Sequence, residues 1–261
     1  FIANSDSLDF LLKGLVKFTP ISELNDPSEL TSNVIFDQVR ISLERLRRDG
    51  YTDEDMINLK RQENLFKRLA PDNQVFKVPD KKELATKTIR HPVYDQISEL
   101  EKRLAETARI MSEKVGLFCL TLRYDSIPMW VHYAKRASGF IIEFNDLNNY
   151  FQGDNTGILY QPINVRYEKE YTGVTFETKS HESLFFSKFQ DWAYEREVRI
   201  VVPLAECQEQ LIDGNRIFLY QLPKSSIKRL ILGWKMPDDE KKYIRNVVAN
   251  LNDAVQVVES K

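Results

Sequence analysis

The sequence predicts an α+β fold, a largely antiparallel β-sheet core with a charged helical insertion. Residues 115–261 hold seven segments of strand composition, and most follow one another without an intervening helix, which favours antiparallel pairing. Residues 31–114 instead show apolar residues at helical spacing among many charges. No glycine-rich phosphate loop is present, and nine glycines in 261 residues disfavour a doubly wound fold. We therefore expect a single domain over 1–261, in which 31–114 is an insertion or lobe and 115–261 is the β-rich core.

The first elements follow from local patterns. "LDFLLKG" predicts a short helix that ends at Gly14, and the apolar residues after it predict a strand at 15–19. In "NDPSE", Asp26 suits the N-cap of a helix whose first position is proline. Within the charged section, "TDED" at 52–55 predicts the start of a helix that runs to Pro71.

The β-rich section is expected to contain strands and two helices. The predicted strands are 115–122, 139–144, 157–168, 197–204, 216–222, 227–234 and 254–259. The predicted helices are "ESLFFSKFQDWAYE" at 182–195 and "DDEKKYIRNVVANLN" at 238–252.

Composition narrows the function classes. A net charge of −2 and a pI near 6.1 give no global electrostatic case for nucleic-acid binding. Two distant cysteines favour a reducing cytoplasm, and three histidines without ligand spacing lead us to expect no metal. No apolar run approaches the roughly 18 residues of a membrane span, so we expect no membrane association. The chain begins at Phe1 without a methionine, so we expect further residues before it.

The stretch "DWAYEREVRIVV", residues 191–202, holds the first candidate site. If it is a strand, Glu195, Glu197 and Arg199 share one face, because side chains alternate with a period of two. One carboxylate of such a pair in a cleft could stabilise developing positive charge while the other accepts a proton. The alternative is a solvent-facing strand on which Arg199 pairs with one acid, worth only about 0 to 1 kcal/mol.

A second candidate is "YDSIPMWVHYAKRASGFIIEF", residues 124–144, where Trp130, His132 and Tyr133 cluster. These side chains are suited to an aromatic platform for a flat ring, since Trp and Tyr combine an apolar face with a polar tip. The alternative is a helical turn whose Trp and Tyr fill the core.

Taken together, these segments resemble the bacterial family catalogued as domain of unknown function 2971. That family has an asparagine–aspartate–proline turn, a Met-Trp-x-His-Tyr-Ala segment with a later acidic strand, and a Trp-x-Tyr-Glu-x-Glu-x-Arg box. The matching residues are Asn25, Asp26 and Pro27; Met129, Trp130, His132, Tyr133, Ala134, Gly139 and Glu143; and Trp192, Tyr194, Glu195, Glu197 and Arg199.

The motif order is also similar to that of ADP-ribosyltransferases, which implies an enzyme that cleaves the nicotinamide–ribose bond of NAD. By this resemblance Glu197 is the catalytic residue that contacts the ribose hydroxyl, and Glu195 serves the acceptor nucleophile. The resemblance implies that Arg199 holds a carboxylate or phosphate. It also implies that Trp130, Tyr133, His132, Tyr194, Asn25 and Asp26 line the substrate cleft.

The implied acceptor of ADP-ribose is a protein or a nucleic acid, and the implied setting is a bacterial toxin or anti-phage effector with a neutralising partner protein. Two other classes stay open. One is a non-catalytic module that binds a nucleotide or a protein. The other is a metal-dependent nuclease that uses Asp26, Glu143, Glu195 and Glu197, since Mg²⁺ prefers oxygen ligands.

Overall fold

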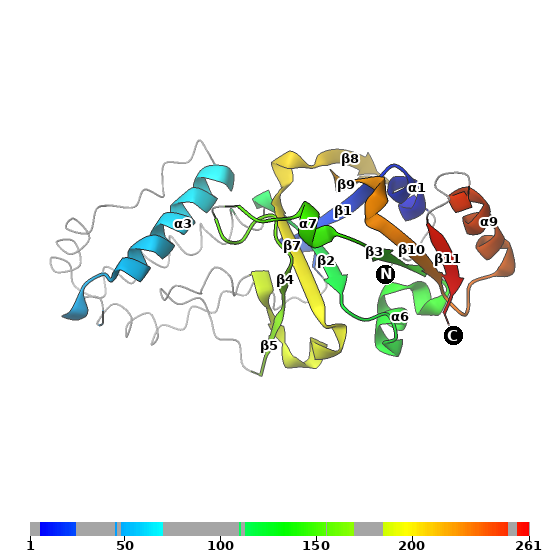
Figure 1. Ribbon diagram of the computed structural model, residues 1–261, viewed down its shortest axis with the longest axis horizontal. Coiled ribbons are helices and arrows are strands. Elements are labelled where there is room, and N and C mark those ends of the chain that lie inside the picture. The colour runs from blue at the N-terminus through cyan, green and yellow to red at the C-terminus, as the bar shows by residue number, and fades with distance from the viewer. Residues whose placement is uncertain are drawn as a thin grey trace.

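The computed structural model describes residues 6–24, 45, 48–69, 110, 113–154, 156–169, 185–249 and 255–260. It confirms the mixed α+β class, built around a six-stranded sheet in which every neighbouring pair is antiparallel (Figure 1). The strand order is β4 (Ile163–Asn164), β7 (Glu197–Pro203), β2 (Val115–Thr121), β1 (Leu15–Pro20), β9 (Asn215–Gln221) and β8 (Gln208–Ile212).

A second, three-stranded sheet lies beside the first. Its order is β11 (Gln256–Glu259), β10 (Ile227–Leu232) and β3 (Phe140–Phe144), with the first pair parallel and the second antiparallel. Helices α1 (Asp6–Leu12) and α9 (Asp238–Ala249) pack on it, with Leu8, Ile244 and Val248 buried against Leu230 and Leu232 (Figure 1). The apolar stripes of the two helices thus cover the same face of this sheet.

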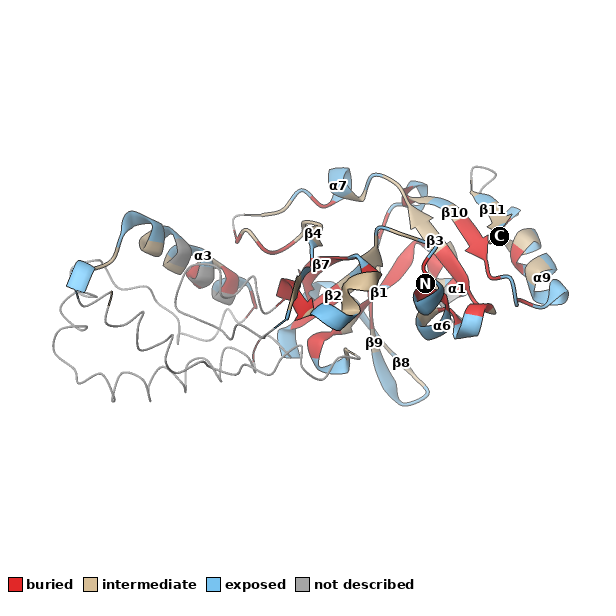
Figure 2. Ribbon diagram, turned by 90° about the horizontal axis from the view of Figure 1, so that it is seen from below, coloured by how far each residue is buried: buried red, intermediate tan, exposed pale blue. Residues whose placement is uncertain are grey.

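Strand β7 is buried along its whole length, because it pairs with β2 on one side and β4 on the other (Figure 2). Its side chains alternate between two separate apolar clusters. Ile200 and Val202 pack in one cluster with Phe18, and Val201 packs in the other with Leu117. Arg199 therefore lies on the Val201 face, inside the protein.

Helix α3 (Asp53–Leu69) covers that same face, since Leu65 and Leu69 belong to the cluster of Val201. The predicted start of this helix is confirmed: the Asp55 amide donates to the Thr52 hydroxyl at 3.1 Å and the Thr52 amide donates to the Asp55 carboxylate at 2.8 Å. Most of the predicted insertion at 31–114 lies outside the described residues. None of the helices in the described ranges combines the length and apolarity needed to cross a membrane.

Short elements link the strands. They are α6 (Ile127–Tyr133), α7 (Leu147–Tyr150), β5 (Arg166–Glu168), β6 (Ser187–Phe189) and the 3-10 turns η1 (Ile21–Glu23), η2 (Lys135–Ala137), η3 (Gln190–Glu195), η4 (Leu204–Glu206) and η5 (Lys224–Ser226). β5 and β6 form a parallel two-stranded ribbon, in which Tyr167 pairs with Lys188.

The predicted helix at 182–195 is wrong from residue 187 onward: residues 185–186 are helical, but strand β6 and turn η3 follow them. The apolar spacing of Phe185, Phe189 and Trp192 fits a helix, but pairing with β5 keeps 187–189 extended. The predicted strand at 157–168 is also only partly right: β4 and β5 are short, and a left-handed Tyr160, at φ 57°, bends the chain before them. β8 is an edge strand that the sequence reading missed.

Gly233 controls how turn η2 attaches to the three-stranded sheet. The Gly233 amide donates to the Gly139 carbonyl at 2.9 Å, and a Cβ at position 233 would lie 2.1 Å from the Ala137 carbonyl oxygen. We expect Gly233→Ala to lower the free energy of unfolding by about 2–3 kcal/mol, measured by urea denaturation. Gly214→Ala is the control. A Cβ at position 214 meets nothing within 4 Å, so only the φ of 79° is unfavourable there, and the expected loss is about 1 kcal/mol. Equal losses of unfolding free energy in the two variants would show that the clash with the Ala137 carbonyl does not destabilise Gly233→Ala.

Candidate functional site

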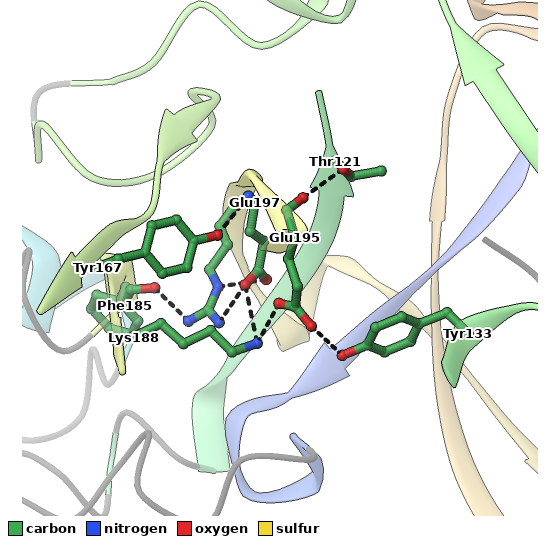
Figure 3. Close-up of polar contacts among 8 residues, drawn as sticks. Thr121, Tyr133, Tyr167, Phe185, Lys188, Glu195 and Glu197 are labelled. Atoms are coloured by element: carbon green, nitrogen blue, oxygen red, sulfur yellow. Dashed lines mark hydrogen bonds and ion pairs between the residues drawn. The ribbon is translucent and has the colours of Figure 1, made fainter. Parts of the chain in front are cut away.

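Two acids and two bases form a buried network where β6, η3 and β7 meet (Figure 3). The acids are Glu195, the last residue of η3, and Glu197, the first of β7; the bases are Lys188 and Arg199. The four side chains are only 1–6% exposed. This excludes the solvent-facing strand as an explanation of the acid pair.

Arg199 binds the Glu197 carboxylate with two nitrogens of its guanidinium group. Its Nε and Nη2 donate to the two carboxylate oxygens at 2.8 and 2.9 Å, and Nη1 donates to the Phe185 carbonyl at 2.8 Å. Such two-point pairing fixes the direction of a carboxylate as well as its charge. The residues are two apart on one strand, so the alternation that places them on one face also makes the pairing possible.

Glu195 is held separately. Lys188 donates to its Oε2 at 2.7 Å, and the Tyr133 hydroxyl of α6 donates to its Oε1 at 2.5 Å (Figure 3). The Lys188 ammonium also reaches Glu197 Oε2 at 3.3 Å and lies 4.8 Å from the centre of the Trp192 ring. Lys188 is therefore the one described residue that binds both carboxylates of the pair.

The backbone between the acids differs from the predicted strand. Glu195 belongs to η3, and Arg196 takes a left-handed conformation with φ 43° before β7 begins. Three bonds fix this bend: the Thr121 hydroxyl donates to the Glu195 carbonyl at 2.6 Å, the Leu122 amide donates to the Arg196 carbonyl at 3.1 Å, and the Glu197 amide donates to the Tyr167 hydroxyl at 2.8 Å. The acids converge because the chain turns here, and not because they alternate along one strand.

The electrostatics of the network favour an ionised Glu197. Burial alone would raise the pKa of this carboxyl, but the charge and hydrogen bonds of Arg199, with the charge of Lys188, outweigh burial and hold the pKa below its usual range. In contrast, burial raises the pKa of the Tyr194 hydroxyl, and the negative charge of Glu195 raises it further.

Because the pKa of Glu197 is lowered in the folded protein, the free energy of unfolding depends on pH. The contribution of Glu197 is present above the pKa of an unfolded glutamate, about 4.3, and is lost as the pH falls through the lower folded value. We expect the free energy of unfolding to fall between about pH 5 and pH 2, and to fall less in Glu197→Gln. Urea unfolding at a series of pH values measures both slopes; parallel slopes would show that Glu197 carries no such linkage.

Partly exposed aromatic side chains border the network on one side. Tyr133, Trp192 and Tyr194 are half-buried, and the exposed His132 ring lies 6.4 Å from that of Tyr194 and 6.3 Å from that of Tyr133. The Trp192 and Tyr194 rings are 6.1 Å apart. Of the predicted aromatic residues, Tyr133, His132 and Tyr194 are therefore gathered beside the acids.

Trp130 does not join them. Its side chain is 2% exposed and packs with Ala134, Ile141 and Ile231 beneath α6, while its indole nitrogen donates to the Tyr124 carbonyl at 2.7 Å. This is the core-filling role that the sequence left open for it. Asn25 and Asp26, the other predicted substrate contacts, lie outside the described residues.

Lys188, Tyr167 and Thr121 were missed by sequence reasoning. The available signal was a lysine inside the apolar run Phe185–Phe189. The set of acids for the metal-dependent alternative is not assembled either: Glu143 lies on β3, bound to Arg229 and, at 2.7 Å, to Lys228. No three His, Cys, Asp or Glu residues of the described chain form a group that could hold a metal ion.

The fold and the site define a class: a mixed α+β protein whose antiparallel sheet carries a buried network of two carboxylates and two cations next to aromatic side chains. Residues 129–200 match the family model described as "Protein of unknown function (DUF2971)", which confirms the resemblance to that family. The matched span runs from α6 to β7 and includes the whole network. No curated protein and no solved structure matches the chain.

Proposed function

We propose that the protein is an ADP-ribosyltransferase-like enzyme that cleaves the nicotinamide–ribose bond of NAD and transfers ADP-ribose to a macromolecule. The observation that carries the proposal is Glu195, a buried carboxylate held by Lys188 and Tyr133 beside half-buried aromatic rings. Aromatic faces suit a flat nicotinamide ring, and a fixed carboxylate suits the positive charge that develops on the ribose.

The reaction needs one bond to break and one to form. The bond between the ribose anomeric carbon and the nicotinamide nitrogen breaks, and nicotinamide leaves as a neutral molecule with the electron pair. The sugar then carries oxocarbenium character, as in glycoside hydrolysis. An acceptor nucleophile attacks the anomeric carbon, and its proton passes to a carboxylate or to solvent.

Within the proposal, Glu195 takes the leading role that sequence reasoning gave to Glu197. Both oxygens of Glu197 are occupied by the Arg199 fork and one of them also by Lys188, whereas each oxygen of Glu195 accepts one described bond. An ionised carboxylate offers about four acceptor positions, so Glu195 retains capacity for a ribose hydroxyl. Glu197 and Arg199 are then positioning residues that fix Lys188 and the start of β7.

Access to Glu195 requires movement, because this residue is only 2% exposed. The half-buried Tyr133, Trp192 and Tyr194 are the side chains next to it that would have to shift. We propose that NAD enters on this side. An activity of this kind, directed at a cellular protein or nucleic acid, would suit a bacterial toxin or anti-phage effector that a partner protein neutralises.

The test is incubation of the full-length protein with NAD labelled in its adenylate part, beside a cell lysate. Nicotinamide release and label in macromolecules are measured together, with Glu195→Gln, Glu197→Gln and heat-unfolded protein in parallel. Release by the wild type and its loss in Glu195→Gln would support the proposal. A folded wild type that releases no nicotinamide, with or without lysate, would remove it.

One observation favours a second candidate, a module that binds a nucleotide without cleaving it. All four carboxylate oxygens of the pair already have a cationic or hydroxyl donor, an arrangement that holds a fold together without any ligand. Titration calorimetry with NAD separates the two candidates: heat of binding without nicotinamide release would select the binding module.

A further inference from the structure

The surface formed by α6 and the segment that leads into it exposes a concentration of apolar side chains. Nine large hydrophobic side chains of the described residues are exposed, and four of them lie between residues 122 and 131. These are Leu122 (70% exposed), Ile127 (66%), Tyr124 (54%) and Val131 (45%). Single exposed apolar residues are normal, but a group of them marks an interaction site.

The folded chain already uses the opposite face of α6. Met129 and Trp130 are buried, whereas Ile127 and Val131, four residues apart, share the outer face. The described chain therefore leaves the Ile127 and Val131 side chains largely exposed, and a partner molecule bound here would bury them.

Positive charge borders these residues. Four exposed cations belong to segments next to α6, and none lies within ion-pair distance of a described acid; they are Lys135, Arg136, Arg196 and Lys235. The first two follow α6 directly, the Lys235 amide bonds the Ala137 carbonyl at 3.0 Å, and the Arg196 carbonyl accepts from Leu122. The neighbouring acid Asp125 is paired with Arg123 at 2.7 Å and is also close enough to feel the charge of Arg196.

This surface adjoins the candidate site. Tyr133, the last residue of α6, donates to Glu195, and Thr121, the residue before Leu122, donates to the Glu195 carbonyl. A molecule seated on α6 would therefore lie next to the proposed reacting carboxylate.

We infer that the α6 surface, made of Leu122, Tyr124, Ile127, Val131 and the four unpaired cations, docks an acidic protein segment with apolar side chains. This inference rests on the proposed function, and it means that the acceptor of ADP-ribose is a protein. Aliphatic Leu, Ile and Val favour a protein, because single-stranded nucleic acids are bound through stacking aromatic rings and phosphate contacts. The cations select acidic partners through charge complementarity.

The first experiment measures transfer and cleavage separately in the full-length protein. We expect Ile127→Glu/Val131→Glu and Lys135→Glu/Arg136→Glu each to lower protein labelling about tenfold. Nicotinamide release without acceptor should stay within about twofold, because NAD does not need this surface. Leu211→Glu is the matched control, since Leu211 is 73% exposed on β8, away from α6, and should label as the wild type does.

The second experiment does not depend on activity. A photo-crosslinking benzophenone amino acid is placed at Ile127 or, as control, at Leu211, and the protein is irradiated in lysate. We expect protease-sensitive adducts at 127 only, reduced by charge reversal at 135 and 136 and by raising salt from about 50 to 300 mM. Adducts with these properties in a protein that cleaves no NAD would uphold the surface and reject the proposed function.

Several results would overturn the inference itself. Unchanged labelling in both double variants would do so, as would label confined to nuclease-sensitive material. No adduct at 127, or an adduct with the mass of two copies of this chain, would reject an acidic protein partner whether or not NAD is cleaved.

Discussion

Replacement of Arg199 by methionine is expected to lower the free energy of unfolding by about 3–5 kcal/mol. Arg199 is 1% exposed, and among the described residues its removal leaves the buried Glu197 carboxylate with Lys188 alone as a charged partner, at 3.3 Å. It also leaves the Phe185 carbonyl without the donor that Nη1 supplies. Urea denaturation followed by circular dichroism measures the loss.

The origin of this loss can be separated from lost packing. In the double variant Arg199→Met/Glu197→Gln no uncompensated negative charge remains, so stability should recover in part. Arg216→Ala is the surface control: Arg216 pairs with Glu209 in two places but is 63% exposed, and the unfolding midpoint should barely move. A double variant no more stable than Arg199→Met would show that packing, and not charge, dominates.

Replacement of Glu195 by glutamine is expected to reduce nicotinamide release about 10²- to 10³-fold, the effect of removing one group that stabilises transition-state charge. Glutamine keeps the size of the side chain and can still accept from Tyr133, but it carries no charge to stabilise an oxocarbenium-like sugar. Initial rates at saturating NAD measure the change in kcat.

Two comparisons make this result specific. Tyr133→Phe removes only the hydroxyl that orients Glu195, so a smaller loss than in Glu195→Gln is expected. Thermal denaturation of each variant shows that the protein measured is folded. A Glu195→Gln enzyme with wild-type kcat would assign the chemistry, if any, to another group.

Much of the fold follows from short-range sequence patterns. Alternation and apolar runs locate β2, β3, β7, β9 and β10 within a few residues, and Thr52 with Asp55 locates the start of α3. The segment at 187–195 shows where such patterns fail. Its aromatic spacing suits a helix, and only pairing with β5, distant in sequence, makes it a strand and a turn.

The residues of the candidate site were also predictable only in part. Glu197 and Arg199 stand out as charges within the apolar segment of β7, Glu195 lies two residues before it, and all three are in the network. Lys188 could not be placed, because its position depends on the β5–β6 ribbon. Trp130 and Tyr133 are three apart on α6, and sequence alone did not show that one faces the core and the other the acids.

The hydrogen bond between Tyr133 and Glu195 joins the two sheets, which are also connected by the packing of Phe144 of β3 against Phe118 of β2. Tyr133 belongs to α6, whose buried side chains rest on β3 and β10, while Glu195 precedes β7 of the larger sheet. A shift of one sheet past the other would stretch this 2.5 Å contact and disturb the packing of Phe144 as well. The Tyr133–Glu195 hydrogen bond thus depends on the alignment of the two sheets. A molecule that displaced α6 would therefore alter the hydrogen bonding of the Glu195 carboxylate.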